Sequence, residues 1–454
     1  MTPLKDTIAA LATPPGIGAL GIIRISGSET IPIVNSVFKG KNLLKAASHT
    51  VHLGTIRDDE GTIIDEVLIS IFKAPRSYTK EDVIEISGHG SHYVLQNVLN
   101  LLILKGARPA KPGEFTQKAF LNGRLDLAQA EAVADLIASE NASMQQTAME
   151  QMRGGFSCEI GKLREELIHF ASMIELELDF AEEDVAFADR KGLIELIHKI
   201  QTLIASLISS FEYGNAIKNG IPVVIAGRPN TGKSTLLNAL LNEEKAIVSE
   251  VAGTTRDIIE DEIHIDGVAF RFIDTAGIRE TNDQVESIGI KRTLTKMKEA
   301  SVVIYLFDLA NESVDSINKQ LNNLRTSGVS CLIAGNKVDK ANSPLKDHLK
   351  EESAVFISAK NRINLEALKE RLKTFIRKPS RPLDTIITNT RHLHSLRQTT
   401  EALNRTLEGI KLQMSNDLVA QDVRSALHHL GEITGEVTSD DLLENIFSKF
   451  CIGK

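Results

Sequence analysis

IPVVIAGRPNTGKSTLLNAL, from Ile221 to Leu240, decides the fold of this 454-residue chain. Its first six residues, Ile221–Ala226, form a short apolar run that predicts a strand. The Leu-rich stretch at its end predicts a helix. Between them stands G-x-x-x-x-G-K-S, Gly227–Ser234, and this strand–loop–helix setting is typical of a phosphate-binding loop. We therefore expect a P-loop nucleotide domain of the doubly wound α/β class, rather than an ordinary Gly-rich turn.

The loop has the residue types that a triphosphate requires. Glycines let backbone N–H groups approach phosphate oxygens, and the helix N-terminus adds the positive end of a dipole. Lys233 can reach the β- and γ-phosphates, and the hydroxyl of Ser234 can ligate Mg²⁺. The nucleotide-binding residues expected here are Asn230, Thr231, Gly232, Lys233, Ser234 and Thr235.

Three further segments follow in the order that a guanine-nucleotide site needs. They are Asp274-Thr275-Ala276-Gly277, Asn336-Lys337-Val338-Asp339 and Ser358-Ala359-Lys360. Asp274 can hold Mg²⁺ through water, and Gly277 can offer its N–H to the γ-phosphate. The Asp339 carboxylate can accept from two guanine N–H groups, whereas adenine presents an acceptor there and is repelled. The sequence therefore predicts GTP binding.

The loop that precedes these segments, Gly253-Thr254-Thr255-Arg256-Asp257, contains threonines that can complete a Mg²⁺ shell while the γ-phosphate is present. One residue is missing from the usual pattern: Ile278 stands where small GTPases place a Gln that orients the attacking water. The nearby carboxylates are Glu280, Asp283 and Glu286. They could act in its place, or they could simply be solvated charges of a switch segment.

Composition limits the remaining possibilities. The chain is too long for one core, and 42% hydrophobic and 25% charged residues are ordinary for a soluble protein. We expect a cytoplasmic protein with no membrane segment, because no uninterrupted apolar run reaches the ~18 residues that span a bilayer. Three cysteines give no disulfide framework. A net charge of −8 argues against DNA binding, but it leaves room for a local basic patch that binds a structured RNA.

Changes in the pattern of apolar and turn-forming residues along the sequence predict four segments. Residues 1–118 read as α+β, with strands expected at 19–26, 51–57, 66–72 and 82–87 and a helix at 91–105. Residues 119–215 and 379–454 read as two parts of a helical domain. The α/β domain, residues 216–378, is inserted between them, and Gly214–Gly220 is expected to be a linker.

At this point the chain resembles the MnmE (TrmE) family of tRNA-modification GTPases along its whole length. The blocks that carry the resemblance are ATPPGIGALGIIRISG (12–27), EDVIEISGHG (81–90), RPAKPGEFTQKAFLNGRLDLAQAEAVADLI (108–137), AGRPNTGKSTLLNAL (226–240), AGTTRD (252–257), DTAGIRE (274–280) and FCIGK (450–454). The nucleotide motifs occur in many GTPases. The N-terminal blocks and the FCIGK ending are specific to this family.

The resemblance implies an N-terminal folate-binding domain through which the chain forms a homodimer, a helical domain and an inserted G domain. It implies a K⁺-stimulated GTPase that joins an FAD-containing MnmG-type partner in a heterotetramer. Together they would add an aminomethyl or carboxymethylaminomethyl group to carbon 5 of the wobble uridine of certain tRNAs. The carbon would come from 5-formyl- or methylene-tetrahydrofolate.

The resemblance also implies roles for single residues. Asn230, Ser249, Val251 and Thr254 match the K⁺ site, Ser234 and Thr255 match Mg²⁺ ligands, and Glu286 matches the residue that orients water. Bound K⁺ would stabilise charge that develops on the phosphates, which fits the missing Gln. Arg24, Glu81, Arg124 and Lys454 match the folate pocket, and Arg124 stands where a Lys is usual.

Cys451 is the remaining residue to which the resemblance assigns a place, close to the modification chemistry. The alternative is a plain buried thiol. A prenylation signal is rejected because Gly453 and Lys454 do not fit one.

Two rival functions stay open on the sequence alone. A ribosome-assembly GTPase, acting as a GTP-controlled binding module, would need only the G domain. A folate-dependent one-carbon enzyme with an incidental G domain would be indifferent to GTP hydrolysis.

Overall fold

The computed structural model describes residues 6–179, 190–245, 261–273, 300–326, 330–340, 354–376 and 386–454. The chain divides into two compact units. The first comprises Met1–Ala138, Ala148–Ile204 and His394–Lys454, and the second comprises Ser139–Thr147 and Ala205–Leu393.

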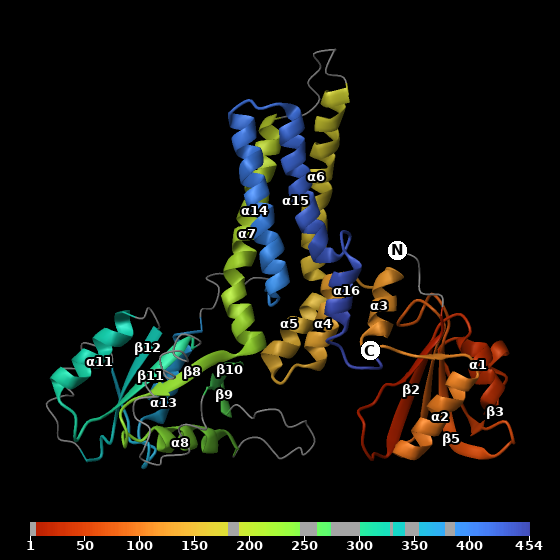
Figure 1. Cartoon of the computed structure of the whole chain (residues 1–454), viewed down its shortest axis with the longest axis horizontal. Helices are drawn as coiled ribbons and strands as arrows, with labels where there is room; N and C mark the ends of the chain where they lie inside the picture. The colour runs from red at the N-terminus through yellow and green to blue at the C-terminus, as the bar shows by residue number, and fades with distance from the viewer. Residues whose placement is uncertain are drawn as a thin grey trace. The chain divides into compact units, whose positions relative to one another are not determined.

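The N-terminal part of the first unit is a seven-stranded sheet in the order β3-β4-β5-β6-β2-β1-β7 (Figure 1). Its strands are β1 (Ile8–Leu11), β2 (Leu20–Ser26), β3 (Phe38–Lys39), β4 (Thr50–Arg57), β5 (Ile63–Phe72), β6 (Val83–His89) and β7 (Arg108–Pro109). Neighbours run antiparallel except β1 and β7. The helices α1 (Thr30–Val37) and α2 (His92–Leu104) and the 3₁₀ turn η1 (Leu43–Lys45) accompany it.

Alternation along the strands places one face of this sheet in the core. Ile23 and Ile25 of β2, Ile69 of β5, and Ile84 and Ile86 of β6 are buried with the apolar residues of α1 and α2. Successive side chains of a strand point to opposite faces, so Leu20, Ile22 and Arg24 share the other face. The predicted α+β class and the strands expected in this region are confirmed.

The helical part of the first unit follows the sheet. Its elements are α3 (Glu114–Leu121), α4 (Leu127–Ile137), α6 (Gly155–Asp179), α15 (Asn416–Thr434) and α16 (Asp440–Phe447), together with portions of α5 (Ala142–Met152), α7 (Arg190–Asn219) and α14 (Thr390–Lys411). The long helices α6, α7, α14 and α15 lie side by side in Figure 1. At the start of α4, Asp126 and Gln129 form a reciprocal capping box, which satisfies two otherwise unpaired N–H groups.

The predicted linker at Gly214–Gly220 is wrong over most of its length, because α7 continues to Asn219. The reason for Gly214 is close packing. A Cβ at this position would lie 2.1 Å from the carbonyl oxygen of Ile387. The Ile387 N–H donates to the Ser210 hydroxyl one turn earlier, at 3.1 Å. A glycine inside a helix can therefore mark the approach of a second chain segment instead of a break.

Among the described residues, α7 is the one helix that is both long enough and apolar enough to cross a bilayer. One such helix is weak evidence, since core helices pass the same test. Leu193, Ile197, Ile200 and Ile204 are fully buried at helical spacing. That pattern is typical of one face of a helix packed in a bundle.

The second unit contains a six-stranded sheet in the order β13-β12-β11-β8-β10-β9. Its elements are β8 (Ile221–Ala226), α8 (Lys233–Lys245), β9 (Asp261–Ile265), β10 (Val268–Phe272), β11 (Val302–Asp308), α11 (Val314–Thr326), β12 (Ser330–Asn336), β13 (Val355–Phe356) and α13 (Leu365–Lys373). All pairings are parallel except that of the edge strand β9. The predicted α/β domain is thus confirmed, inserted in the chain between α7 and α14.

Candidate functional site

The phosphate-binding loop leaves the sheet between β11 and β10, which flank β8 on its two sides. The loop needs both of its glycines. Gly227 has φ +157°, and a Cβ there would lie 2.1 Å from the Leu306 carbonyl; Gly232 has φ +97°, and a Cβ would lie 2.4 Å from Nδ2 of Asn336. Backbone N–H groups are therefore free of side-chain cover where a phosphate would approach.

Lys233 begins α8, and its ammonium donates to the carbonyl oxygens of Gly227 and Arg228, both at 2.9 Å. Burial lowers the pKa of this lysine. Both of these partners are neutral, so the partly desolvated ammonium is well suited to bind an anion. Thr231 donates to the Arg228 carbonyl at 2.9 Å, which fixes the turn.

The predicted base-binding segment is joined directly to the phosphate loop. Nδ2 of Asn336 donates to the Thr231 carbonyl at 2.8 Å, and Nζ of Lys337 donates to the Asn230 carbonyl at 2.8 Å. The Lys337 ammonium also pairs with the buried carboxylate of Asp308 at 2.7 Å. Burial alone would raise the pKa of Asp308. The hydrogen bonds that its carboxylate accepts from Lys337 and from residues just after Asp308 in the sequence hold this pKa below its usual value.

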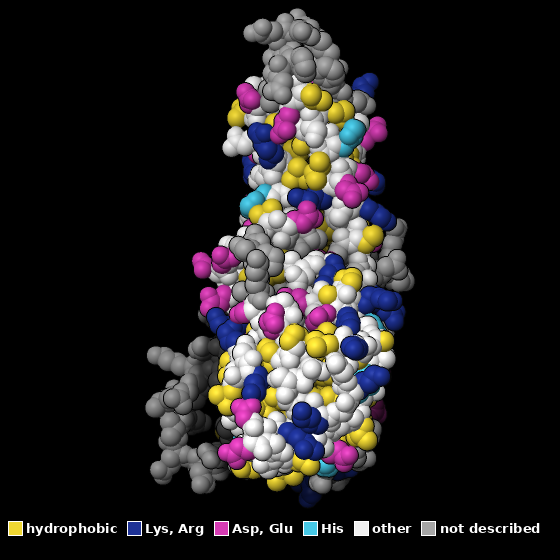
Figure 2. Space-filling model, turned by 90° about the vertical axis from the view of Figure 1, so that its right-hand side faces the viewer, with side chains coloured by type: hydrophobic (Ala, Val, Ile, Leu, Met, Phe, Trp, Pro, Cys, Tyr) yellow, Lys and Arg dark blue, Asp and Glu magenta, His cyan; other side chains and the backbone are white. Residues whose placement is uncertain are grey.

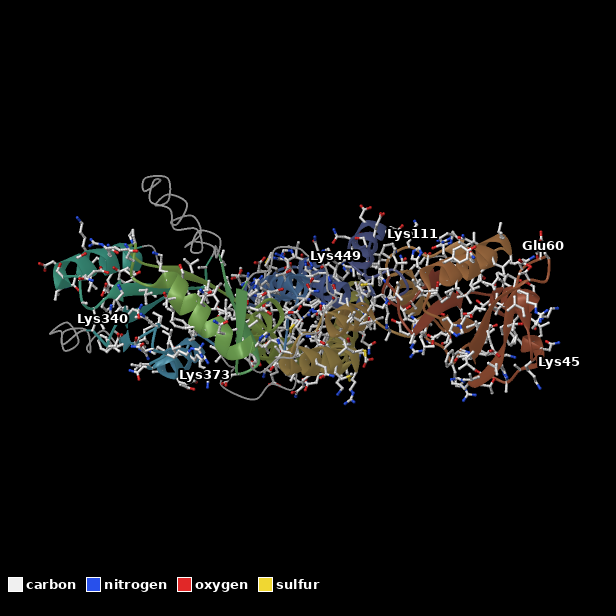
Figure 3. All side chains as sticks on the ribbon, turned by 90° about the horizontal axis from the view of Figure 1, so that it is seen from below. Lys45, Glu60, Lys111, Lys340, Lys373 and Lys449 are labelled. Atoms are coloured by element: carbon white, nitrogen blue, oxygen red, sulfur yellow. The ribbon has the colours of Figure 1, made fainter. Side chains whose placement is uncertain are left out.

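Asn336 also connects the third segment, because its Oδ1 accepts from the Ala359 N–H at 3.0 Å. Asp339 is exposed, and a hydrogen bond from buried Ser358 lowers the pKa of its carboxyl. The carboxylate is thereby kept ionised and available as an acceptor. Lys360 is exposed beside it, and Lys340, which follows Asp339, marks this edge of the domain in Figure 3.

Several predicted site residues lie outside the described residues. They are Ser249, Val251, Thr254, Thr255, Asp274, Thr275, Ala276, Gly277, Ile278 and Glu286. The boundary between residues 378 and 379 also falls there. Of the predicted metal ligands, Asn230 and Ser234 are described. Asn230 is exposed in a left-handed conformation with φ 63°, and Ser234 is in the first turn of α8.

A second concave site lies in the first unit, where three cationic side chains lie near the ring of Tyr78. The guanidinium carbons of Arg24 and Arg124 lie 5.4 and 5.5 Å from the centre of the Tyr78 ring, and the Lys454 ammonium lies at 6.0 Å. Burial and then the charge of Arg24 lower the pKa of Lys454. Arg124 donates to the Ser77 carbonyl. Three of the four residues predicted for the folate pocket are therefore brought together.

The cavity at this place has a volume of about 420 Å³. It is lined by His49, Phe72, Arg76, Ser77, Tyr78, Val83, Glu85 and Arg124. Its lining carboxylate is Glu85, which lies opposite Arg24 on neighbouring strands and accepts from it at 3.0 and 2.8 Å. The pair is largely covered, with 14% of the Arg24 side chain and 28% of the Glu85 side chain exposed.

Glu81, the carboxylate predicted for this pocket, does not line the cavity. It accepts from the ammonium of Lys118 at 2.9 Å and from Ser26 at 3.2 Å. The Lys118 side chain is only 1% exposed, so its charge requires such a partner. The structure thus puts Glu81 in a buried ion pair, and it puts Glu85, four residues later, in the cavity.

The FCIGK segment completes the site from the far end of the chain. The Gly453 carbonyl accepts from Nη1 of Arg24 at 3.1 Å. Gly453 has φ +95°, and a Cβ would lie 2.5 Å from the Leu11 carbonyl oxygen, so the segment fits closely against β1. Cys451 is exposed, and its carbonyl accepts from the Gly113 N–H at 3.3 Å.

Both parts of the first unit match family models. Residues 7–124 match the N-terminus of GTP-binding protein TrmE, and residues 127–451 match the MnmE helical domain. The tRNA modification GTPase MnmE of Cytophaga hutchinsonii is 57% identical over 99% of this chain and 98% of its own. The MnmE proteins of Christiangramia forsetii and Flavobacterium johnsoniae are each 54% identical over 99% of this chain and 100% and 99% of their own.

The chain belongs to the MnmE family of tRNA modification GTPases. Within this member of the MnmE family, sequence reasoning missed Tyr78 and Glu85. Both stand in or beside the EDVIEISGHG block, and strand alternation could have found Glu85. It shares a sheet face with the residues two positions away on β6, and Arg24 occupies the same face of β2.

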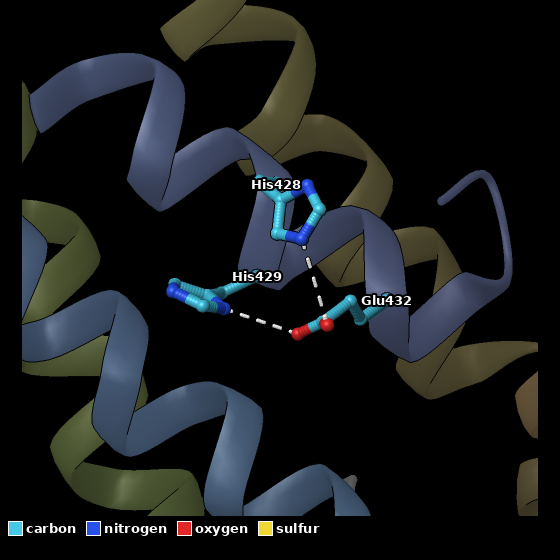
Figure 4. A group of neighbouring side chains, drawn as sticks. All are labelled: His428, His429 and Glu432. Carbon is cyan, nitrogen blue, oxygen red and sulfur yellow. Dashed lines mark hydrogen bonds and ion pairs between the residues drawn. The ribbon is translucent and has the colours of Figure 1, made fainter. Parts of the chain in front are cut away.

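One other group of potential metal ligands occurs among the described residues of this MnmE member. His428, His429 and Glu432 lie on α15 with their ligand atoms within 4.8 Å of one another (Figure 4). Glu432 is within 3.0 Å of His429 and 3.6 Å of His428. Each carboxylate oxygen therefore already faces one imidazole. This arrangement is that of a hydrogen-bonded cluster of polar side chains on α15.

Proposed function

We propose that this chain hydrolyses GTP and uses the nucleotide cycle to modify the wobble uridine of certain tRNAs. The observation that carries the GTP part is the hydrogen-bonded connection from the phosphate loop through Asn336 and Lys337 to Ala359. These hydrogen bonds support a single site formed by the predicted phosphate, base and closing segments. An ionised Asp339 beside it selects guanine over adenine.

Mg²⁺ and K⁺ belong to this proposal. The described residues fit them, since the Ser234 hydroxyl and the Asn230 side-chain carbonyl are hard oxygen ligands at the loop. Ser249, Val251, Thr254 and Thr255 would supply the remaining oxygens. Bound cations would offset charge that develops on the phosphates. Lys233 would exchange its two carbonyl partners for phosphate oxygens, and Glu286 would orient the attacking water in place of the missing Gln.

We further propose that the cavity beside Tyr78 binds a tetrahydrofolate derivative, either 5-formyl- or methylene-tetrahydrofolate. Arg76, Arg124 and Glu85 line it together with Phe72 and Val83. Arg24 and Lys454 lie 5.4 and 6.0 Å from the centre of the Tyr78 ring, which also lines it. Glu85 can accept hydrogen bonds from the donor edge of a pterin-like ring, and Arg124 and Lys454 can hold the glutamate carboxylates. Phe72 and Tyr78 offer faces for the rings.

The proposal includes a homodimer formed through the N-terminal sheet. On the uncovered face, Leu53 and Leu68 lie opposite each other on β4 and β5 and are 64% and 46% exposed. Val51 is exposed two residues from Leu53 on β4, and Leu20 is exposed on the face of β2 that carries Arg24. Exposed apolar side chains gathered in this way favour burial against a second copy. Leu53→Lys should then convert a dimer to a monomer in light scattering.

The tRNA partner and the FAD-containing MnmG-type partner rest on the family alone. On the face shown in Figure 2, basic and acidic side chains are interspersed with hydrophobic ones. A cytoplasmic location and a role for Cys451 close to the transferred carbon belong to the same proposal.

The test is nucleoside analysis of tRNA from cells that lack this protein. Loss of the C5-substituted wobble uridine, restored by the wild-type gene and not by Glu286→Ala, is the expected result. Purified protein should hydrolyse GTP faster in K⁺ than in Na⁺. Normal wobble nucleosides with defective ribosomal subunits would instead favour a ribosome-assembly GTPase. Modification that continues when GTP cannot be hydrolysed would favour a folate enzyme with an incidental G domain.

A further inference from the structure

The rim of the cavity contains more positive charge than one folate glutamate needs. Arg76 and Arg124 both line it and are exposed, and Lys73 is half-buried three residues before Arg76. The one lining carboxylate, Glu85, is already paired with Arg24. The positive charges of the exposed arginines at the rim are therefore not neutralised by a lining carboxylate.

Arg76 differs from the other cations of the site. Arg24 is held by Glu85 and by the Gly453 carbonyl, and Arg124 by the Ser77 carbonyl. The guanidinium of Arg76 has no hydrogen-bond or ion-pair partner in the described part of the chain. It keeps all five N–H donors for a ligand, and its planar fork matches a carboxylate.

The positions of the charges indicate which end of a folate would reach the rim. Glu85 is covered and would accept from the ring, whereas the exposed arginines stand at the opening. A ligand with its ring at Glu85 directs its glutamate outward. Folates occur with chains of γ-linked glutamates, and each added unit contributes another α-carboxylate beyond the first.

We infer that this site, which rests on the proposed folate function, recognises the poly-γ-glutamyl tail, with Arg76 as the residue that binds the carboxylates beyond the first. Arg124 and Lys454 hold the first glutamate. Arg76 then discriminates between folates by tail length without contacting the ring.

The experiment is a titration of the full-length protein with 5-formyl-tetrahydrofolate that has one, three or five glutamates. The triglutamate should bind about fivefold more tightly than the monoglutamate, because an exposed ion pair contributes modestly. The gain should shrink as salt rises from 0.05 to about 0.5 M. Arg76→Gln should abolish the gain and leave the monoglutamate affinity unchanged, which also reports that the variant is folded.

Lys39→Gln is the matched control. Lys39 is exposed and lies opposite Thr55, at the end of β4 remote from His49. The Lys39→Gln variant removes the same charge from the same domain, and it should still bind the triglutamate more tightly than the monoglutamate. Equal affinity of the wild type for all three ligands would overturn the inference. So would an equal loss of mono- and triglutamate binding in Arg76→Gln. If the wild type bound none of the three, the proposed folate function itself would fail.

Discussion

The phosphate loop and the cavity beside Tyr78 are the two places where we propose that anionic groups bind, and they are built in opposite ways. The loop draws its phosphate-binding groups from eight consecutive residues, and most of them are backbone N–H groups freed by glycines. The cavity is lined by the charged side chains of Arg76, Glu85 and Arg124, and Arg24 and Lys454 lie close to its Tyr78 ring. Only the tertiary fold brings these residues together. Substitutions in the phosphate loop should therefore act by changing the local backbone geometry. Substitutions at the cavity should act by weakening the docking of segments that are remote in the sequence.

The largest expected effect comes from Lys337→Ala in the nucleotide unit. It leaves the buried Asp308 carboxylate without its ammonium partner and detaches the Asn230 carbonyl. Breaking a buried ion pair on one side costs about 3 kcal/mol. The thermal midpoint of this unit should fall by several degrees, and GTP binding should be lost.

The double variant Lys337→Ala/Asp308→Asn removes the stranded charge as well. It should recover most of the stability in the same thermal scan without recovering GTP affinity. A single variant as stable as the wild type would show that Asp308 does not depend on Lys337.

Gly453→Ala is the corresponding change for the cavity. A methyl group at φ +95° and 2.5 Å from the Leu11 carbonyl should displace the FCIGK segment, at a cost of about 2 kcal/mol. Folate affinity should fall at least tenfold in a fluorescence titration, with GTP hydrolysis unchanged.

Gly61→Ala provides the control for backbone strain. Gly61 has φ +86° but open space around its Cβ position. This variant should bind folate as the wild type does. A similar loss in both variants would mean that strain, and not docking of the segment, governs the site.

Two neighbouring carboxylates should respond differently to the same substitution. Glu85→Gln should lower folate affinity about tenfold, or ~1.4 kcal/mol, because the ring loses a charged acceptor. Glu81→Gln should mainly lower the thermal midpoint of the first unit, since it weakens the pairing of buried Lys118. If Glu81→Gln removed folate binding while stability was unchanged, the roles given to the two residues would be reversed.

The smallest effect is a fractional proton uptake when GTP binds. Burial lowers the pKa of Lys233 in the free protein, and phosphate oxygens favour the charged form and raise it. In the pH window between those two pKa values, binding takes up protons and affinity falls as pH rises. Calorimetry in two buffers of different ionisation enthalpy would measure the uptake. Identical heats throughout that window would contradict the assignment to Lys233.

These two sites also differ in how far the sequence predicts them. The phosphate loop, the strand before it and the helix after it can be predicted, because one contiguous sequence pattern corresponds to one backbone geometry. Glu81 and Glu85 cannot be separated by composition, because the distinction depends on where β6 begins. Glu85 lies in the strand opposite Arg24, whereas Glu81 precedes the strand and pairs with Lys118. Gly214 led to a wrong linker prediction for a similar reason. In the sequence, a glycine that is required by close contact with Ile387 cannot be told from a glycine in a flexible linker.

The contact between Arg24 and the Gly453 carbonyl joins residues 429 positions apart. On the ribosome, the N-terminal sheet emerges long before its partner segment, and the G domain has time to fold in between. A nascent chain could therefore have a folded G domain before the cavity that we propose to bind folate is complete. That cavity would form only after synthesis had reached the last residues of the chain.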